Sequence, residues 1–360
     1  MLSKLQKMAI GFAVVSALVL VLAGYCIAVV ESALYVPCHP KARTYLNDPE
    51  KATEFEKERQ LQLPMVDKRI RSPYSHHRIP GPSQDITLDA WWIPAVKKTQ
   101  KTVILLHGYR SSKHSPRLLF LAGMYHQAGM NVLLFDYRNH GYSSCPTHRH
   151  TAGQEESDDL LAVKKWLVKE QGIASSSIGV HGISLGGLTA MIAMSKDPTL
   201  AAVIAETPPY DMKTVAYSEL RRQKAPEILI PFIVGLEDSL IRHYLGIDLD
   251  KVTAKMGIEK LNNRPLMVLF STKDSRVPYK GHFDKLVEDA AKYQQPLKII
   301  LLEGADHDGF LEYMIPWYEK NVPVFLKDNL VDGKQQKSMK TITHQDILIR
   351  TKVVPRELLK

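Results

Sequence analysis

Residues 182–186 read Gly-Ile-Ser-Leu-Gly, and they stand between a short apolar run at 177–181 and a helix-like stretch at 185–195. A sharp turn from strand to helix leaves no room for side chains at its flanks, which accounts for both glycines. Such a turn lifts the Ser184 hydroxyl above the sheet and directs the first helix amides at an anion. We therefore predict that Ser184 is a nucleophile. The alternative interpretation is a glycine-rich turn with an unreactive serine.

Further apolar runs on both sides of this segment repeat the same strand–helix pattern. They occupy residues 85–93, 102–106, 131–135, 201–205, 266–270 and 297–302. Helix-like stretches at 117–127, 154–171 and 280–293 separate several of them. Continuous apolar runs suit strands that are buried on both faces. Repeated βα units form a mostly parallel sheet, so we predict an α/β fold with a doubly wound sheet.

Polar residues just beyond the strands are the candidates for chemistry, because the site of such a sheet lies outside the carboxyl ends of its strands. A serine hydroxyl needs a base to remove its proton, and His307 follows the last apolar run. Asp274 ends the preceding strand segment, where a carboxylate would orient the histidine. The order Ser184, Asp274, His307 is the nucleophile–acid–base order of a single fold family. The alternative for His307 is a histidine of a surface loop.

With these residues in place, the chain resembles the α/β-hydrolase superfamily over residues 66–330. The motifs that carry the resemblance are HGY at 107–109, DYRNHGYS at 136–143, GISLGG at 182–187, Asp274 with the VP pair at 277–278, and GADH at 304–307. Within the superfamily the chain is similar to the membrane-anchored α/β-hydrolase domain proteins and to the serine-aminopeptidase-like group. The resemblance implies an oxyanion hole formed by the backbone N–H groups of Tyr109 and Leu185. It implies no metal and no organic cofactor.

Residues 207–262 are too long for a simple connection between strands, and in the resembling family an insertion here forms a helical lid. Four apolar residues of this segment, Ile228, Ile230, Phe232 and Ile233, either line an acyl pocket or only pack the lid on the domain. Residues 136–143 carry a turn of the resembling family, which we interpret as structural.

The amino-terminal residues 8–30 contain no formal charge and follow Lys4 and Lys7. As a helix they exceed the roughly 30 Å hydrocarbon core of a membrane, so we predict a single transmembrane anchor. A cleaved signal peptide and a lipoprotein signal are the alternatives. The two lysines favour a cytoplasmic amino-terminal end at residues 1–7 and a main domain on the other side. Cys38 and Cys145 would then lie where disulfides form, but the sequence leaves their pairing open.

The charge of the chain is +9, of which residues 1–7 carry +2 and residues 331–360 carry +4, leaving +3 for residues 8–330. A surplus at the two ends argues against a nucleic-acid partner. We interpret 331–360 as a basic tail that contacts anionic lipid and 31–65 as a spacer between anchor and domain. Three cysteines make neither a disulfide framework nor a zinc site.

These observations predict a membrane-anchored serine hydrolase that cleaves an acyl ester or thioester of a small-molecule substrate, lipid-derived molecules included. A peptidase or an acyltransferase with the same three residues is one alternative. A noncatalytic, membrane-tethered binding protein is another, and a broken set of catalytic residues would have favoured it. The sequence does not determine the acyl chain length or the oligomeric state.

Overall fold

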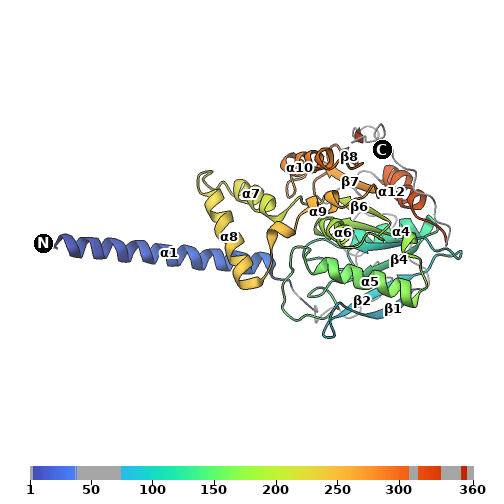
Figure 1. The fold of residues 1–360 in the computed structure, drawn as a ribbon, viewed down its shortest axis with the longest axis horizontal. Helices are drawn as coiled ribbons and strands as arrows, with labels where there is room; N and C mark the ends of the chain where they lie inside the picture. The colour runs from blue at the N-terminus through green and yellow to red at the C-terminus, as the bar shows by residue number, and fades with distance from the viewer. Residues whose placement is uncertain (1–2, 37, 39–73, 308–314, 334–349, 355–360) are drawn as a thin grey trace.

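The computed structural model describes residues 3–36, 38, 74–307, 315–333 and 350–354. Its centre is a sheet in the order β1-β2-β4-β3-β5-β6-β7-β8-β9 (Figure 1). The strands are β1 (Ser75–Pro80), β2 (Thr87–Ile93), β3 (Thr102–Leu106), β4 (Asn131–Phe135), β5 (Ile178–Ile183), β6 (Ala202–Glu206), β7 (Leu266–Ser271), β8 (Lys298–Leu302) and β9 (Arg350–Val354). β1 and β2 are antiparallel to their neighbours, and the pairs from β4 through β9 are parallel. The predicted doubly wound, mostly parallel sheet is confirmed.

Helices cover both faces of the sheet. The helices of the domain are α4 (Pro116–Gln127), α5 (Glu156–Glu170), α6 (Leu185–Lys196), α7 (Met212–Arg222), α8 (Ile230–Leu245), α9 (Ala254–Glu259), α10 (Tyr279–Lys292) and α12 (Ile315–Asn329), with short 3-10 turns at Ser175–Ser177 and Leu249–Lys251. Alternate residues of β3 illustrate why its apolar run is continuous. Val103 and Leu105 belong to the hydrophobic cluster that contains residues of α4 and α12, whereas Ile104 and Leu106 belong to the cluster that contains residues of α5, α6 and α10.

The segment predicted as a lid contains α7, α8 and α9 between β6 and β7. α7 and α8 form a hairpin that projects from the domain on the side from which the amino-terminal helix leaves (Figure 1). α9 instead packs on α6 and α10, so this part of the insertion belongs to the body of the domain. The predicted helical insertion is therefore present, and its projecting part is the α7–α8 hairpin.

The amino-terminal helix α1 (Lys4–Leu34) is longer than the predicted anchor at 8–30. Its last turn is packed on the domain, where Val30 and Leu34 are buried. The expectation of a spacer starting at residue 31 is therefore wrong, because residues 31–36 continue the helix and then bind the domain. Residues 39–65 of the expected spacer lie outside the described residues.

Two edge strands differ from the prediction. β1 was not expected because its sequence, SHHRIP, has no continuous apolar run. In this edge strand Ile79 alone is buried. β9 lies within the expected basic tail at 331–360 and pairs in parallel with β8. The sheet therefore continues beyond the predicted domain end at residue 330, since β8 had a free edge that this segment covers. Residues 334–349 and 355–360 of the expected tail lie outside the described part of the chain.

Candidate active site

The turn between β5 and α6 holds Ser184 in a backbone conformation that few side chains adopt, with φ 54° and ψ −119°. The closeness of the two flanking segments explains the glycines. A Cβ atom on Gly182 would lie 2.1 Å from the carbonyl oxygen of Gly186, and one on Gly186 would lie 2.6 Å from that of Leu106. The Ser184 amide donates to the carbonyl oxygen of Glu206 at 2.7 Å, which ties the turn to β6. Strain of this kind is typical of functional sites.

Ser184, His307 and Asp274 form a continuous hydrogen-bonded relay. The Ser184 Oγ and His307 Nε2 atoms are 2.9 Å apart, and the His307 Nδ1 and Asp274 Oδ2 atoms are 2.7 Å apart. The second Asp274 oxygen accepts the amides of Arg276 at 2.9 Å and Val277 at 2.7 Å, which fixes the carboxylate. The structure thus brings together the three residues that the sequence singled out. Although they are far apart in the chain, the three residues meet in space because β5, β7 and β8 end at the same edge of the sheet.

Asp306 is a residue of this site that the sequence argument did not use. Its carboxylate accepts the amide of His307 at 2.7 Å and both the amide and the hydroxyl of Ser275 at 2.9 Å. These hydrogen bonds lower the pKa of Asp306. They join the loop after β8 to the loop after β7, so the carboxylate helps to hold His307 next to Asp274.

The segment after β3 passes next to Ser184. A Cβ atom on Gly108 would lie 3.4 Å from the Cβ of Ser184, so the backbone that leads into Tyr109 lies beside the serine. Within the described chain, neither the Tyr109 amide nor the Leu185 amide is used in a turn, loop or cap hydrogen bond. The first amides of a helix lack intrahelical partners, and the Leu185 amide is the first of α6. Both groups are therefore available to a negatively charged oxygen beside Ser184.

A buried cluster of one lysine and two carboxylates supports the loop that carries Tyr109. Lys113 is fully buried, and its Nζ binds Asp136 at 2.7 Å and Asp89 at 2.6 Å. Burial opposes the ionisation of Asp136, but the charge and hydrogen bond of Lys113, together with the nearby histidines, outweigh it and lower the pKa of this carboxyl to about 2. Gly141, at φ +48°, is needed because a Cβ there would lie 2.1 Å from the carboxylate. These contacts agree with the structural interpretation of the turn at 136–143.

Two cavities meet at Ser184. The smaller, about 90 Å³, is polar and includes His107, Tyr109, Ser111 and Arg276 in its wall. The larger, about 860 Å³, extends from Ser184 and His307 between the lid and α1. Its apolar wall includes Ile233, Val234 and Ile241 of α8.

The four lid residues named from the sequence divide between these environments. Ile233 lines the large cavity, and Ile230 is buried without lining it. Ile228 and Phe232 are 87% and 60% exposed, so neither forms part of an acyl pocket wall. Of the two alternatives, lining a pocket holds for Ile233 and packing the lid holds for Ile230, and neither holds for the exposed Ile228 and Phe232.

The end of α1 is held by side chains of the catalytic domain. The Tyr109 hydroxyl and the His150 Nε2–H donate to the carbonyl oxygen of Ala33 at 2.5 and 3.1 Å. Arg110 donates to the carbonyl oxygens of Ser32 and, at 2.9 Å, of Tyr35. The last carbonyls of a helix have no intrahelical partners. In this protein two loops of the domain supply those partners, and the sequence carried no signal for it.

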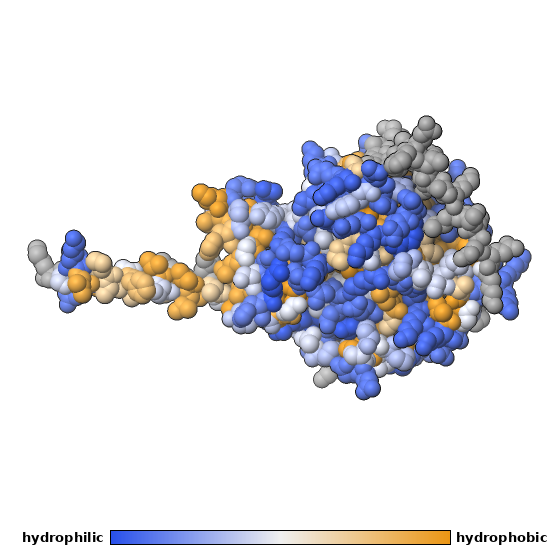
Figure 2. Space-filling view, viewed as in Figure 1, coloured by the Kyte–Doolittle hydropathy of each residue, from blue (hydrophilic) through white to orange (hydrophobic). Residues whose placement is uncertain are grey.

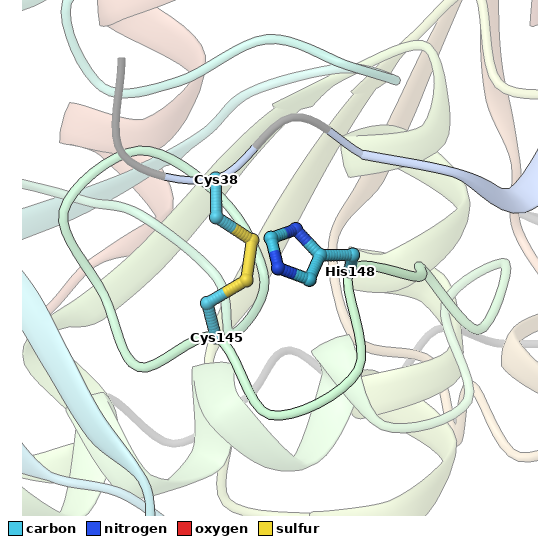
Figure 3. Close-up of side chains that lie close together, drawn as sticks. All are labelled: Cys38, Cys145 and His148. Atoms are coloured by element: carbon cyan, nitrogen blue, oxygen red, sulfur yellow. A yellow bond between two sulfur atoms is a disulfide. The ribbon is translucent and has the colours of Figure 1, made fainter. Parts of the chain in front are cut away.

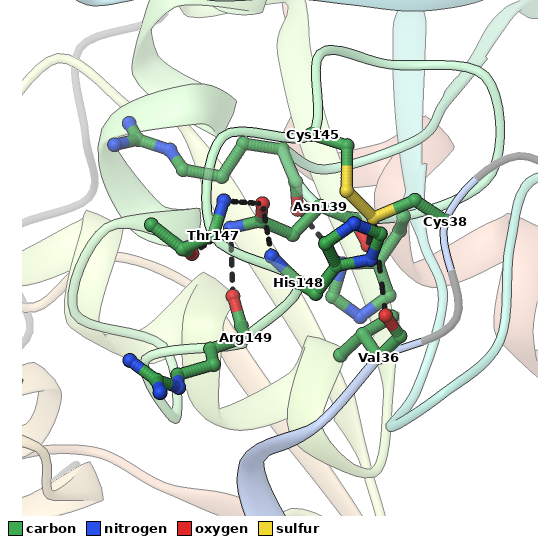
Figure 4. Close-up of a disulfide and its surroundings, with 9 residues drawn as sticks. Val36, Cys38, Asn139, Cys145, Thr147, His148 and Arg149 are labelled. Carbon is green, nitrogen blue, oxygen red and sulfur yellow. Dashed lines mark hydrogen bonds between the residues drawn. A yellow bond between two sulfur atoms is a disulfide. The ribbon is translucent and has the colours of Figure 1, made fainter.

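A covalent link holds the same junction. Cys38, just after α1, and Cys145, after the turn at 136–143, form a disulfide (Figure 3). Asn139 accepts the amides of Thr147 and His148, which fixes the loop that carries Cys145 (Figure 4). The His148 ring lies next to the two sulfurs. Because the sulfurs are bonded to each other, they do not serve as thiolate ligands for a metal.

Comparisons with known proteins place this geometry among hydrolases. The family model described as the prolyl oligopeptidase family matches residues 117–330. The chain is 27% identical over 242 residues to the uncharacterized protein YqkD of Bacillus subtilis, covering 66% of this chain and 74% of that protein. It is 24% identical over 232 residues to the putative esterase YitV of the same organism, covering 60% and 88%. A solved structure of the Pyrococcus furiosus esterase Pf2001 matches with a TM-score of 0.58 and 26% identity, over 72% of this chain and 94% of that chain.

Proposed function

The chain belongs to the prolyl oligopeptidase family of serine hydrolases with the α/β-hydrolase fold, and from that premise we propose a membrane-anchored enzyme that cleaves acyl esters or thioesters. Ser184 is the nucleophile, His307 the general base and Asp274 the residue that orients it. The observation that carries this proposal is the unbroken relay from Ser184 Oγ through His307 to Asp274. An unbroken relay also argues against a noncatalytic binding protein that merely kept the fold.

The reaction proceeds through an acyl-enzyme. His307 Nε2 takes the proton of Ser184 Oγ as this oxygen bonds to the acyl carbon of the substrate. The carbonyl oxygen gains the negative charge and accepts hydrogen bonds from the Tyr109 and Leu185 amides. When the tetrahedral intermediate collapses, the bond to the leaving oxygen or sulfur breaks and His307 returns the proton to it. Water, deprotonated by the same histidine, then releases the acid and restores Ser184.

Two observations favour an ester or thioester over a peptide. The large cavity at Ser184 has an apolar wall on the lid and on α1, which suits an acyl chain. Among the relatives, one is named a putative esterase and another, matching 36% of this chain, a thiohydrolase. A peptidase and an acyltransferase would use the same relay, so substrate comparison separates the three activities.

The proposed anchor is α1. Its 31 residues span about 46 Å at about 1.5 Å per residue, and one 18-residue window has a mean hydropathy of 2.7 with little of it buried. That length exceeds the roughly 30 Å of a bilayer core. The Cys38–Cys145 disulfide supports a catalytic domain on the non-cytoplasmic side, where disulfides persist. Protease added to intact cells should digest the domain, and complete protection would reverse this topology.

The central test uses Ser184→Ala with Ser195→Ala as its control, because both serines lie at or within α6. Ser184→Ala should lose fluorophosphonate labelling and at least about 10³-fold in the hydrolysis rate of a p-nitrophenyl ester. Ser195→Ala should keep both. Ester turnover by Ser184→Ala at the wild-type rate would refute the assignment. Parallel assays with acyl-peptide amides and with an added alcohol acceptor identify a peptidase or an acyltransferase.

A further inference from the structure

We propose that the substrate is an acyl lipid of the surrounding membrane, which enters between α1 and α8 and lays its acyl chain along the last turns of the anchor helix. The proposal rests on the function proposed above and names the substrate class of that site. It makes α1 part of the active site as well as an anchor. Val30 is then a residue that determines acyl-chain specificity.

The wall of the large cavity carries this inference. Six residues of α1 line it: Tyr25, Cys26, Val29, Val30, Ala33 and Leu34. They recur at the three- and four-residue spacing that places side chains on one face of a helix. The opposite wall comes from α7 and α8, and α8 packs against α1. The same cavity reaches Ser184 and His307, so a chain lying along this face of α1 ends at the nucleophile. Its volume of about 860 Å³ falls within the roughly 300–1,000 Å³ of pockets that enclose small molecules.

The position of this wall along α1 places the cavity at the membrane surface. About 20 helical residues cross a bilayer core. Counted from Met8, where the uncharged run begins, they end near Ile27. The cavity wall from Tyr25 to Val30 therefore lies where the hydrocarbon core meets the headgroups. Tyr25 is 63% exposed, and tyrosine is enriched at this boundary.

The lid carries an apolar surface on the same side. Hydrophobic residues cover most of α1 and continue onto the end of the hairpin beside it (Figure 2). Ile228, Leu229 and Phe232 are 87%, 47% and 60% exposed there. Exposed apolar residues grouped beside a membrane helix mark a surface that contacts lipid. The entrance that we propose between α1 and α8 therefore faces the acyl chains of the membrane.

Val30 provides the decisive variant, because it is buried within the cavity wall. Val30→Trp should shorten the space for the acyl chain, and Ala28→Trp on the exposed side of α1 is its matched control. The full-length protein in lipid nanodiscs would be assayed with acetyl, octanoyl and palmitoyl p-nitrophenyl esters. In Val30→Trp the palmitoyl rate should fall at least about tenfold relative to the acetyl rate, since one displaced methylene in an apolar pocket is worth about that much. Ala28→Trp should keep the wild-type profile.

A second measurement does not depend on the folding of a variant. A fluorophosphonate with a long alkyl chain that ends in a diazirine would label Ser184 of the wild-type protein and then be photolysed. Cross-links to the segment 25–34 of α1 support the proposal. Cross-links that reach no residue of this segment, or an unchanged chain-length profile in Val30→Trp, overturn it. If the wild-type protein were neither labelled by the probe nor active on the acetyl ester, the proposed function itself would be refuted.

Discussion

The Tyr109 hydroxyl donates a hydrogen bond to the carbonyl oxygen of Ala33 at 2.5 Å. This bond joins the loop after β3, which is proposed to hold the oxyanion, to the last turn of α1. Arg110 adds bonds to two further carbonyls of the same turn. The Tyr109 amide is therefore positioned partly by α1, although its own peptide unit lies in the catalytic domain.

Arg110→Ala should lower kcat on a short, soluble ester about tenfold while changing KM little. The substitution loosens the loop after β3, whose Tyr109 amide is proposed to bind the oxyanion, and Arg110 does not line the large cavity. An oxyanion donor acts on the transition state, and its misplacement lowers kcat. Arg149→Ala is the control: it removes the ion pair with Glu31 at the same helix end, which is more than one-third exposed on both sides. Such pairs contribute about 1 kcal/mol or less. Equal kcat values in the two variants would show that α1 does not position the loop.

The disulfide should stabilise the junction between α1 and the domain. It closes a segment of 107 residues, for which chain entropy gives up to about 4.7 kcal/mol. The double variant Cys38→Ser/Cys145→Ser should unfold at a clearly lower urea concentration than the wild-type protein in the same detergent. Dithiothreitol should shift the wild-type midpoint toward that of the variant and leave the variant unchanged. A wild-type midpoint insensitive to the reductant, with free thiols demonstrated, would contradict this role.

The convergence of the candidate catalytic residues was predictable from the sequence because parallel strands bring their carboxyl ends to one edge. Ser184, Asp274 and His307 each follow an apolar run, so their convergence needs only the sheet. The docking of α1 was not predictable, since its partners Tyr109 and Arg110 resemble ordinary loop residues until the fold brings the helix end to them.

Lys113 shows a second limit of sequence reasoning. A lysine in a loop is usually exposed, but this one is fully buried because the carboxylates of Asp89 and Asp136 converge on it. The edge strands β1 and β9 were missed for a related reason. Strands at an edge bury less apolar surface than central ones, so an argument from apolar runs does not detect them.

Gly182→Ala should abolish activity and destabilise the domain, because its Cβ would overlap the Gly186 carbonyl. The backbone on both sides of the turn between β5 and α6 would have to move, and the Ser184–His307 hydrogen bond would be lost. Gly235→Ala in α8 is the control, since no atom lies within 4 Å of a Cβ there. Alanine in a helix interior is favoured over glycine by roughly 1 kcal/mol. Gly182→Ala should therefore have a lower urea midpoint and a lower rate of ester hydrolysis than Gly235→Ala. An active Gly182→Ala enzyme would show that the turn does not require glycine at position 182.

Stability should fall in mild acid partly because of His282, which lies in α10 near Asp274. Its Nδ1 accepts the Tyr210 amide at 2.9 Å, so the neutral ring is the form that fits. Burial lowers the pKa of His282 to about 4, despite the nearby Asp211 carboxylate. In the unfolded chain the pKa is about 6.5. The unfolded state therefore binds the proton first as the pH falls, and the stabilisation present above about pH 6.5 is lost on the way to about pH 4.

Between about pH 7.5 and pH 5 this histidine should account for about 2 kcal/mol of lost unfolding free energy. His282→Asn keeps an acceptor for the Tyr210 amide but does not titrate. The variant should therefore lose less stability than the wild-type protein over the same pH interval, whatever its stability at the upper pH. Urea titrations of both proteins at the two pH values measure the difference directly. Equal losses in the two proteins would mean that another group, such as the buried His107, whose pKa burial lowers to about 3, governs the acid sensitivity.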